Sequence, residues 1–257
     1  MATKQSLVSL TIAVGLVLAA ASCGDSDKAG TTPPSTSTSS TPPPSSTPTP
    51  SVPSTPPAST PAVPPATKPR TVPELTKALL ALPDLPAGFS IDTSTEEDDS
   101  KLSSTNARCK DLVLLFNAKT APGAKASVVR SYTAGQQGPY FDQNLDAMGS
   151  PAAVTALLNR TRTAIKSCKQ AKLTIPGTGS STMTISEISV PKAGANPVGV
   201  RFTANSGPLD GLEGVFAFTG IGDVVLTMSF DSSDIEGAFG TAAAKAIKTL
   251  GTAKSGT

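Results

Sequence analysis

The stretch SPAAVTALLNRTRTAIKSC, residues 150–168, predicts one long helix that ends in a cysteine. Ser150 is a suitable N-cap, and Pro151 fits the first helical position because the N–H it lacks would find no helical partner there. Six residues then recur at helical spacing on one face: Val154, Leu157, Leu158, Thr161, Ile165 and Cys168. We therefore expect Cys168 to face the core.

A second helix is predicted upstream, over residues 107–118. Its apolar face contains Cys109, Leu112, Val113 and Phe116. Two inward-facing cysteines on two helices predict a buried disulfide between Cys109 and Cys168, provided that the fold brings their Cα atoms within bridging distance.

The rest of the folded region mixes helical and strand patterns. Thr71 and Glu74 form a capping-box pattern ahead of a helix that should end at Pro83. A closing helix is expected over residues 234–250. Period-two patterns predict strands over 89–92, 127–133, 140–146, 182–190, 198–204, 213–219 and 224–230. Short connections favour antiparallel neighbours, so we predict a single α+β domain over 71–253, with helices packed on one face of the sheet and a short disordered tail over 254–257.

The N-terminus has the pattern of an export signal. Lys4 precedes an apolar run, Leu7–Ala19, that is short for a membrane span. The run is followed by Ala20-Ala21-Ser22-Cys23, which resembles a bacterial lipobox. That resemblance implies a lipoprotein signal peptide over 1–22, acyl chains on Cys23 and a location on the outer face of the plasma membrane. A secretory signal with an incidental cysteine is the alternative.

Residues 23–70 have the composition of a linker. Most of the chain's 24 prolines lie between Pro33 and Pro69, among Ser, Thr and Ala. Such a segment has little apolar surface to bury, so we expect it to be disordered. It is either a spacer that carries the domain through a cell wall or a tolerated tether.

Composition excludes several function classes. From Pro73 onward, Lys+Arg and Asp+Glu both number 17, so the folded region lacks the basic excess of a nucleic-acid-binding protein. Histidine is absent, which removes the usual general base and the commonest metal ligand. Ser189–Lys192 matches the S-x-x-K motif but follows a strand rather than opening a helix. We therefore predict no enzyme activity, no catalytic residue, no cofactor and no metal site.

The segment LALPDLPAGF, residues 80–89, resembles the opening of actinobacterial sensor domain-containing lipoproteins. The helix ending in Ser167-Cys168 and the strands after it extend the likeness. That group is similar to the extracellular sensor domain of PknH-type receptor kinases. The resemblance implies a twisted antiparallel sheet, helices and a cleft that receives a ligand. This sequence departs from the kinase sensor in having one cysteine pair where that domain has two disulfides.

Candidate ligand-binding residues follow from strand faces. Arg130 and Tyr132 share one face of their strand, and Arg201 alternates with Val200 and Phe202, so these polar side chains would line an open side of the sheet. Arg162, Lys166 and Lys169 form a basic stripe, which suits either the helix dipole or an anionic wall polymer or lipid headgroup.

We favour a membrane-anchored ligand-binding or sensory module whose ligand is a cell-wall component, a lipid or an envelope protein. The alternatives are a structural or interaction lipoprotein without a small-molecule site and a lipid or glycolipid carrier.

Overall fold

The computed structural model describes residues 70–93, 99–135, 138–231 and 236–251. The predicted signal peptide, Cys23, most of the linker and the C-terminal tail lie outside these residues. So does residue 234, the expected start of the last helix.

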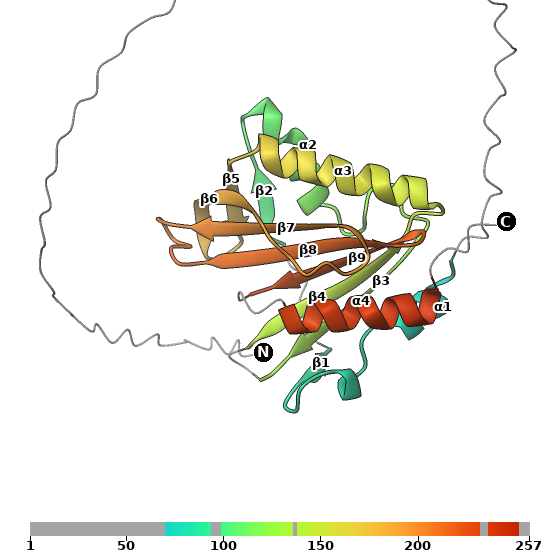
Figure 1. The fold of residues 1–257 in the computed structure, drawn as a ribbon. Coiled ribbons are helices and arrows are strands. Elements are labelled where there is room, and N and C mark those ends of the chain that lie inside the picture. Colours follow the sequence, from blue (N-terminus) through green and yellow to red (C-terminus); the bar gives the residue numbers. More distant parts are fainter. Residues whose placement is uncertain (1–69, 94–98, 136–137, 232–235, 252–257) are drawn as a thin grey trace, which may run out of the picture. The chain divides into compact units, whose positions relative to one another are not determined.

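One nine-stranded antiparallel sheet forms the centre of the described region (Figure 1). Its strand order is β1-β3-β4-β9-β8-β7-β6-β5-β2. Most neighbouring strands in the sheet also follow one another in the sequence. The two short strands β1 and β2 form the edges, where few unpaired backbone groups are exposed. The bounds are β1 Ser90–Asp92, β2 Lys101–Ser103, β3 Ala126–Thr133, β4 Tyr140–Ala147, β5 Gln170–Ile175, β6 Gly179–Ile188, β7 Ala195–Ala204, β8 Glu213–Ile221 and β9 Val224–Phe230.

Two pairs of helices cover opposite faces of the sheet (Figure 1). On one face, α1 (Val72–Ala78) and α4 (Glu236–Leu250) pack together, α1 against β3 and α4 against β8. On the other face, α2 (Lys110–Phe116) and α3 (Pro151–Ser167) pack together, and α3 lies over β6, β7 and β8. The two short 3₁₀ turns are η1 (Leu82–Asp84) and η2 (Ala107–Cys109).

The predicted α+β class, the antiparallel sheet and the single disulfide-linked domain are confirmed. The expectation of helices on one face only is corrected by the pattern of buried residues. In β9, Leu226 packs in the core under α4, while its neighbour Val225 packs under α3. Because adjacent side chains on a strand point to opposite faces, a central strand that buries both must be covered on both sides.

Helix α3 forms as its sequence indicates. The Ser150 hydroxyl accepts a hydrogen bond from the Ala153 N–H at 3.2 Å, and Pro151 opens the helix. The residues of the predicted face are all buried, and Cys168 is the C-cap.

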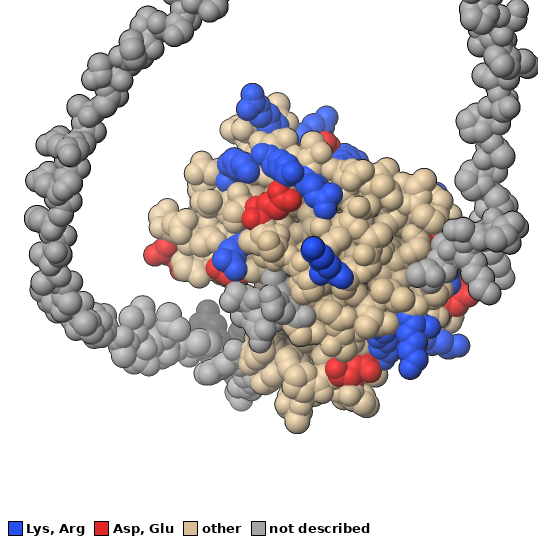
Figure 2. Space-filling view, viewed as in Figure 1, with Lys and Arg blue, Asp and Glu red and all other residues tan. Residues whose placement is uncertain are grey.

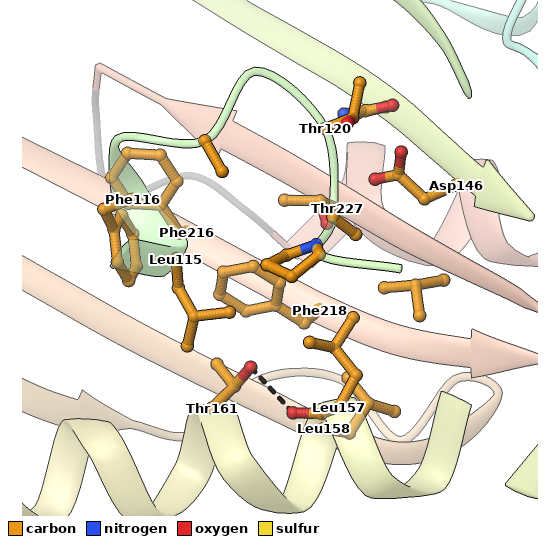
Figure 3. A pocket seen from close by; sticks show the side chains of 15 residues that line it. Leu115, Phe116, Thr120, Asp146, Leu157, Leu158, Thr161, Phe216, Phe218 and Thr227 are labelled. Atoms are coloured by element: carbon orange, nitrogen blue, oxygen red, sulfur yellow. Dashed lines mark hydrogen bonds between the residues drawn. The ribbon is translucent and has the colours of Figure 1, made fainter. Parts of the chain in front are cut away.

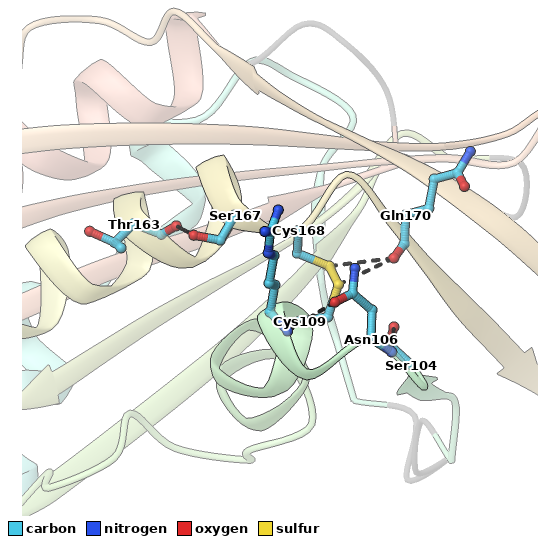
Figure 4. The surroundings of a disulfide bond; sticks show 8 residues. Ser104, Asn106, Cys109, Thr163, Ser167, Cys168 and Gln170 are labelled. Carbon is cyan, nitrogen blue, oxygen red and sulfur yellow. Dashed lines mark hydrogen bonds between the residues drawn. A yellow bond between two sulfur atoms is a disulfide. The ribbon is translucent and has the colours of Figure 1, made fainter.

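The predicted disulfide joins the start of α2 to the end of α3 (Figure 4). Cys109 and Cys168 are fully buried, with their Cα atoms 4.7 Å apart. The carbonyl oxygen of Gln170 lies 3.3 Å and 3.4 Å from the two sulfur atoms, a contact rather than a hydrogen bond because a disulfide has no hydrogen to donate. The bridge thus holds α2, α3 and the first residue of β5 together.

Three local expectations differ from the structure. Strands β2 and β5 were not predicted, since β2 has a single buried residue, Leu102, and β5 follows the helix after only two residues. Helix α1 ends at Ala78, before the prolines that were expected to end it. The chain is extended from Leu79 because the backbone of Leu80 makes hydrogen bonds with β3 and β4.

Loss of the bridge should destabilise the domain. We expect Cys168→Ser to lower the free energy of unfolding by up to about 4 kcal/mol, because the bridge closes a long loop in the unfolded chain. The Cys109→Ser/Cys168→Ser double variant should be no less stable than either single variant. Thermal unfolding followed by circular dichroism measures this. Two free thiols among Cys109 and Cys168 in the denatured, unreduced protein would contradict the pairing.

Candidate functional site

Three rows of side chains cross the sheet on the face that carries α2 and α3. The strand register aligns Asp142 with Ser229 and Phe216, Asn144 with Thr227 and Phe218, and Asp146 with Val225 and Gly220. Strand β4 therefore contributes polar groups, β9 contributes small side chains and β8 contributes aromatic rings. The face changes from polar to apolar over three strands.

Helices α2 and α3 cover the apolar part of this face. Phe116 of α2 makes edge-to-face contacts with Phe202 and Phe216, with ring centroids 4.7 Å and 4.9 Å apart. From α3, Val154 approaches Gly220 so closely that a Cβ there would lie 2.7 Å from Val154 Cγ1. The glycine lets α3 pack directly on β8.

A cavity of 130 Å³ lies where the helical layer meets the polar rows (Figure 3). Its walls come from the end of α2, the connection to β3, the first half of α3 and strands β4, β8 and β9. Most of the lining is apolar, and Thr120, Asn144, Asp146, Thr161 and Thr227 add polar groups.

Asp146 is the charged group of this cavity. Its side chain lines the cavity although the residue is only 1 % exposed, and its Oδ1 has no hydrogen-bond partner. In Figure 3 its carboxyl group points from β4 toward the side where Thr120 and Thr227 lie. Burial raises the pKa of Asp146, and hydrogen bonds from the Ser127 hydroxyl and the Ala121 N–H oppose that shift.

The raised pKa has a consequence for stability. Because the folded pKa of Asp146 lies above the unfolded value, the unfolded chain releases this proton first as the pH rises. The ionised group therefore costs stability at pH values above the folded pKa and costs none below the unfolded value. Ionisable groups whose pKa is shifted by burial cluster at functional sites, so Asp146 is a candidate binding group.

Arg130 and Tyr132 lie on the opposite face, under α1. The Arg130 Nη1 and the Tyr132 hydroxyl both donate to the carbonyl oxygen of Leu80, each at 2.7 Å. The N–H of Leu80 donates to Gln143 Oε1, also at 2.7 Å. Tyr132 is only 1 % exposed, and burial raises its pKa. The structure brings these two residues together, but as groups that hold the chain after α1 against the sheet.

Arg201 lies on the same face as Tyr132 but several strands away. It pairs with Glu213 at 3.2 Å. Arg201, Arg130 and Tyr132 are absent from the linings of the 130 Å³, 450 Å³, 270 Å³ and 230 Å³ hollows in the described part of the chain. These three residues therefore lie outside the candidate site, and their role in ligand binding stays a prediction.

The basic stripe of α3 is partly neutralised by the sheet. Arg162 and Lys166 both face Glu187 of β6, at 3.7 Å and 3.9 Å, and Arg162 also donates to the Pro197 carbonyl oxygen at 2.9 Å. Figure 2 shows acidic side chains among the basic ones at the upper end of the domain, where α3 lies in Figure 1. These contacts favour a structural role for the stripe.

Further hollows border the fold. One of 270 Å³ shares Phe116 and Phe216 with the first cavity, and one of 450 Å³ lies against α4. The lining of the larger one includes Pro139 and Gly237, which adjoin or lie close to residues outside the described part of the chain. The first cavity is the one that combines apolar walls with a buried carboxylate lacking a partner on one oxygen.

The described residues contain neither a metal-binding cluster nor a membrane-spanning helix. No group of three or more His, Cys, Asp or Glu residues there could hold a metal ion. No helix in the same part of the chain has the length and apolarity needed to cross a membrane.

With the geometry established, the chain can be compared with known proteins. A solved structure of the extracellular domain of PknH from Mycobacterium tuberculosis superposes with a TM-score of 0.54 at 15% sequence identity. The match covers 71% of this chain and 98% of that domain. The two folds are similar. Comparisons with protein-family models and with curated proteins give no match.

The likeness extends to fold alone, since the identity is low. It confirms the fold that the resemblance of residues 80–89 implied. Sequence reasoning missed Asp146, which reads as an outward-facing strand residue in the pattern Asp-Gln-Asn-Leu-Asp over 142–146. One sequence feature does indicate burial here, because the next residues, Ala147 and Met148, are apolar. The residues that lie over Asp146, however, are distant from it in the sequence.

Proposed function

We propose that this protein is a lipid-anchored, extracytoplasmic ligand-binding module of sensory type, and that its site is the 130 Å³ cavity beside Asp146. The observation that carries the proposal is the buried carboxylate oxygen left without a partner at the wall of an apolar cavity. Ligand sites in proteins combine mostly apolar walls with a few placed polar groups. The fold shared with the extracellular domain of PknH supports the extracytoplasmic assignment.

The neighbourhood of the cavity suits binding rather than reaction. Thr227 and Asn144 supply neutral hydrogen-bonding groups beside the single carboxyl group, Phe218 adjoins Thr227 on the sheet, and Leu157 and Leu158 of α3 add apolar surface. The disulfide keeps α2 and α3 together, so the apolar wall is formed before any ligand arrives. A preformed wall reduces the ordering cost of binding.

The anchor part of the proposal rests on Cys23. The lipobox resemblance implies a diacylglyceryl group on its thiol, with or without acylation of its amine, and two or more acyl chains are needed for firm membrane attachment. In this proposal the Pro- and Thr-rich segment up to Arg70 spaces the domain from the membrane surface.

Filling the cavity should abolish ligand retention. Thr227→Phe adds a ring at the centre of the cavity wall, whereas Val129→Phe adds the same ring on the same sheet face, at a residue that is 65 % exposed and outside the lining. Native mass spectrometry of the protein purified from membranes should show a bound small molecule on the wild type and on Val129→Phe, and none on Thr227→Phe. The same added mass on Thr227→Phe, or none on the wild type, would contradict the proposed site.

Cys23→Ala tests the anchor. Without the acylated sulfur, the variant should either stay unprocessed or leave the membrane fraction, as cell fractionation and immunoblotting would show. Ser22→Thr serves as the control, because it leaves the cysteine in place. Normal processing of Cys23→Ala together with membrane retention after a salt wash would refute lipid anchoring.

A further inference from the structure

Asp146 and Asp223 each have one buried carboxylate oxygen without a hydrogen-bond partner, but among the described residues no cation is paired with Asp146, whose carboxyl group is contacted only by the Ser127 hydroxyl and the Ala121 N–H. Asp142 lies four residues before Asp146 on the same face but is exposed, and it accepts a hydrogen bond from the Ser229 hydroxyl at 2.9 Å. Asp223 is nearly as buried as Asp146, but the Arg70 guanidinium donates to its Oδ1 at 3.1 Å. Carboxylates are almost never fully buried without a partner. The unpaired oxygen of Asp146 indicates a partner that the described part of the chain does not supply.

The walls of the cavity limit what that partner can be. Among the described residues that line it there is no Lys, Arg or His. An anionic ligand would therefore meet a like charge and no compensating one. The rings of Phe116, Phe216 and Phe218 also line the cavity and supply apolar contact surface. The charge of the lining favours a cation.

The size of the cavity limits the size of the apolar part of the ligand. Its volume of 130 Å³ is close to the roughly 150 Å³ cavity that holds benzene in an engineered protein. Space for about one six-membered ring, next to a carboxylate, suits a compact amine. The apolar part would contact Leu157, Leu158 and Phe218, while the charged nitrogen would lie at the β4 side of the cavity.

We propose that the cavity binds a small organic ammonium ion, with Asp146 as its counter-ion and the phenylalanine and leucine side chains around its apolar part. The ammonium N–H donates to Asp146 Oδ1 in a charge-assisted hydrogen bond, at an oxygen that no described residue contacts with a hydrogen bond. This inference rests on the proposed ligand-binding function and names the chemical class of its ligand.

Two probes of nearly equal shape separate charge from fit. Cyclohexylammonium and cyclohexanol differ mainly in the charge of the polar group. We expect the full-length protein to bind cyclohexylammonium at least tenfold more tightly than cyclohexanol at neutral pH, as titration followed by NMR methyl shifts of Leu157 and Leu158 would report. The two-probe comparison needs no variant, so it does not depend on a substitution that might impair folding.

A pair of isosteric substitutions assigns the preference to one carboxylate. Asp146→Asn keeps an acceptor oxygen but removes the charge, so it should lose the tenfold preference for the ammonium probe. Asp142→Asn removes a charge from the same strand and face, outside the lining of this cavity, and should keep the preference. Circular dichroism and thermal unfolding verify that each variant is folded.

The outcomes separate this inference from the proposed function. Equal binding of the two probes to the wild type would overturn the ammonium assignment and leave the cavity as a ligand site. Equal loss of preference in Asp142→Asn and Asp146→Asn would also overturn the role of Asp146. Binding of neither probe would overturn the ammonium assignment, and the native mass spectra of Thr227→Phe would then decide the proposed function independently.

Discussion

Side-chain alternation along the paired strands determines what each helix of this domain has to cover. Strand β9 buries Leu226 on one face and Val225 on the other, and neither face can be left in water. Burial of apolar surface is the main stabilising term in folding, so both faces need a layer of helix. Helices α1 and α4 cover one face, and α2 and α3 cover the other.

The two layers are held by different means. The backbone of Leu80 bonds to Arg130, Tyr132 and Gln143, which attaches the chain after α1 to β3 and β4. The other layer is cross-linked by the disulfide at the end of α3. This second layer stops short of the polar groups on β4, and the cavity lies at its border. The site is thus a product of incomplete cover over one half of one face.

Much of the fold could be predicted from local patterns, and the site could not. Helix α3 carries its own cap, its apolar face and its cysteine, so its extent and orientation follow from the residues of one segment. The covering of both sheet faces depends on register between strands far apart in sequence, which period-two patterns do not reveal. Asp146 has the pattern of a solvated strand residue, yet it is buried, and the connection after α2 lies against it, with the Ala121 N–H contacting its carboxyl group. The sequence places Arg130 and Tyr132 on one face of their strand, but their hydrogen-bonding partner, the Leu80 carbonyl, has no sequence signature.

The central claim is that the disulfide-linked helical layer leaves one carboxylate buried and uncompensated at the cavity. A direct test is the pH titration of the Asp146 side-chain carboxyl carbon by NMR, in the full-length, oxidised protein without ligand. The account predicts a pKa for Asp146 above the ordinary value of 3.8, because burial disfavours the charged form. A pKa at or below 3.8 would mean that the carboxylate is solvated or already paired, and it would contradict the account.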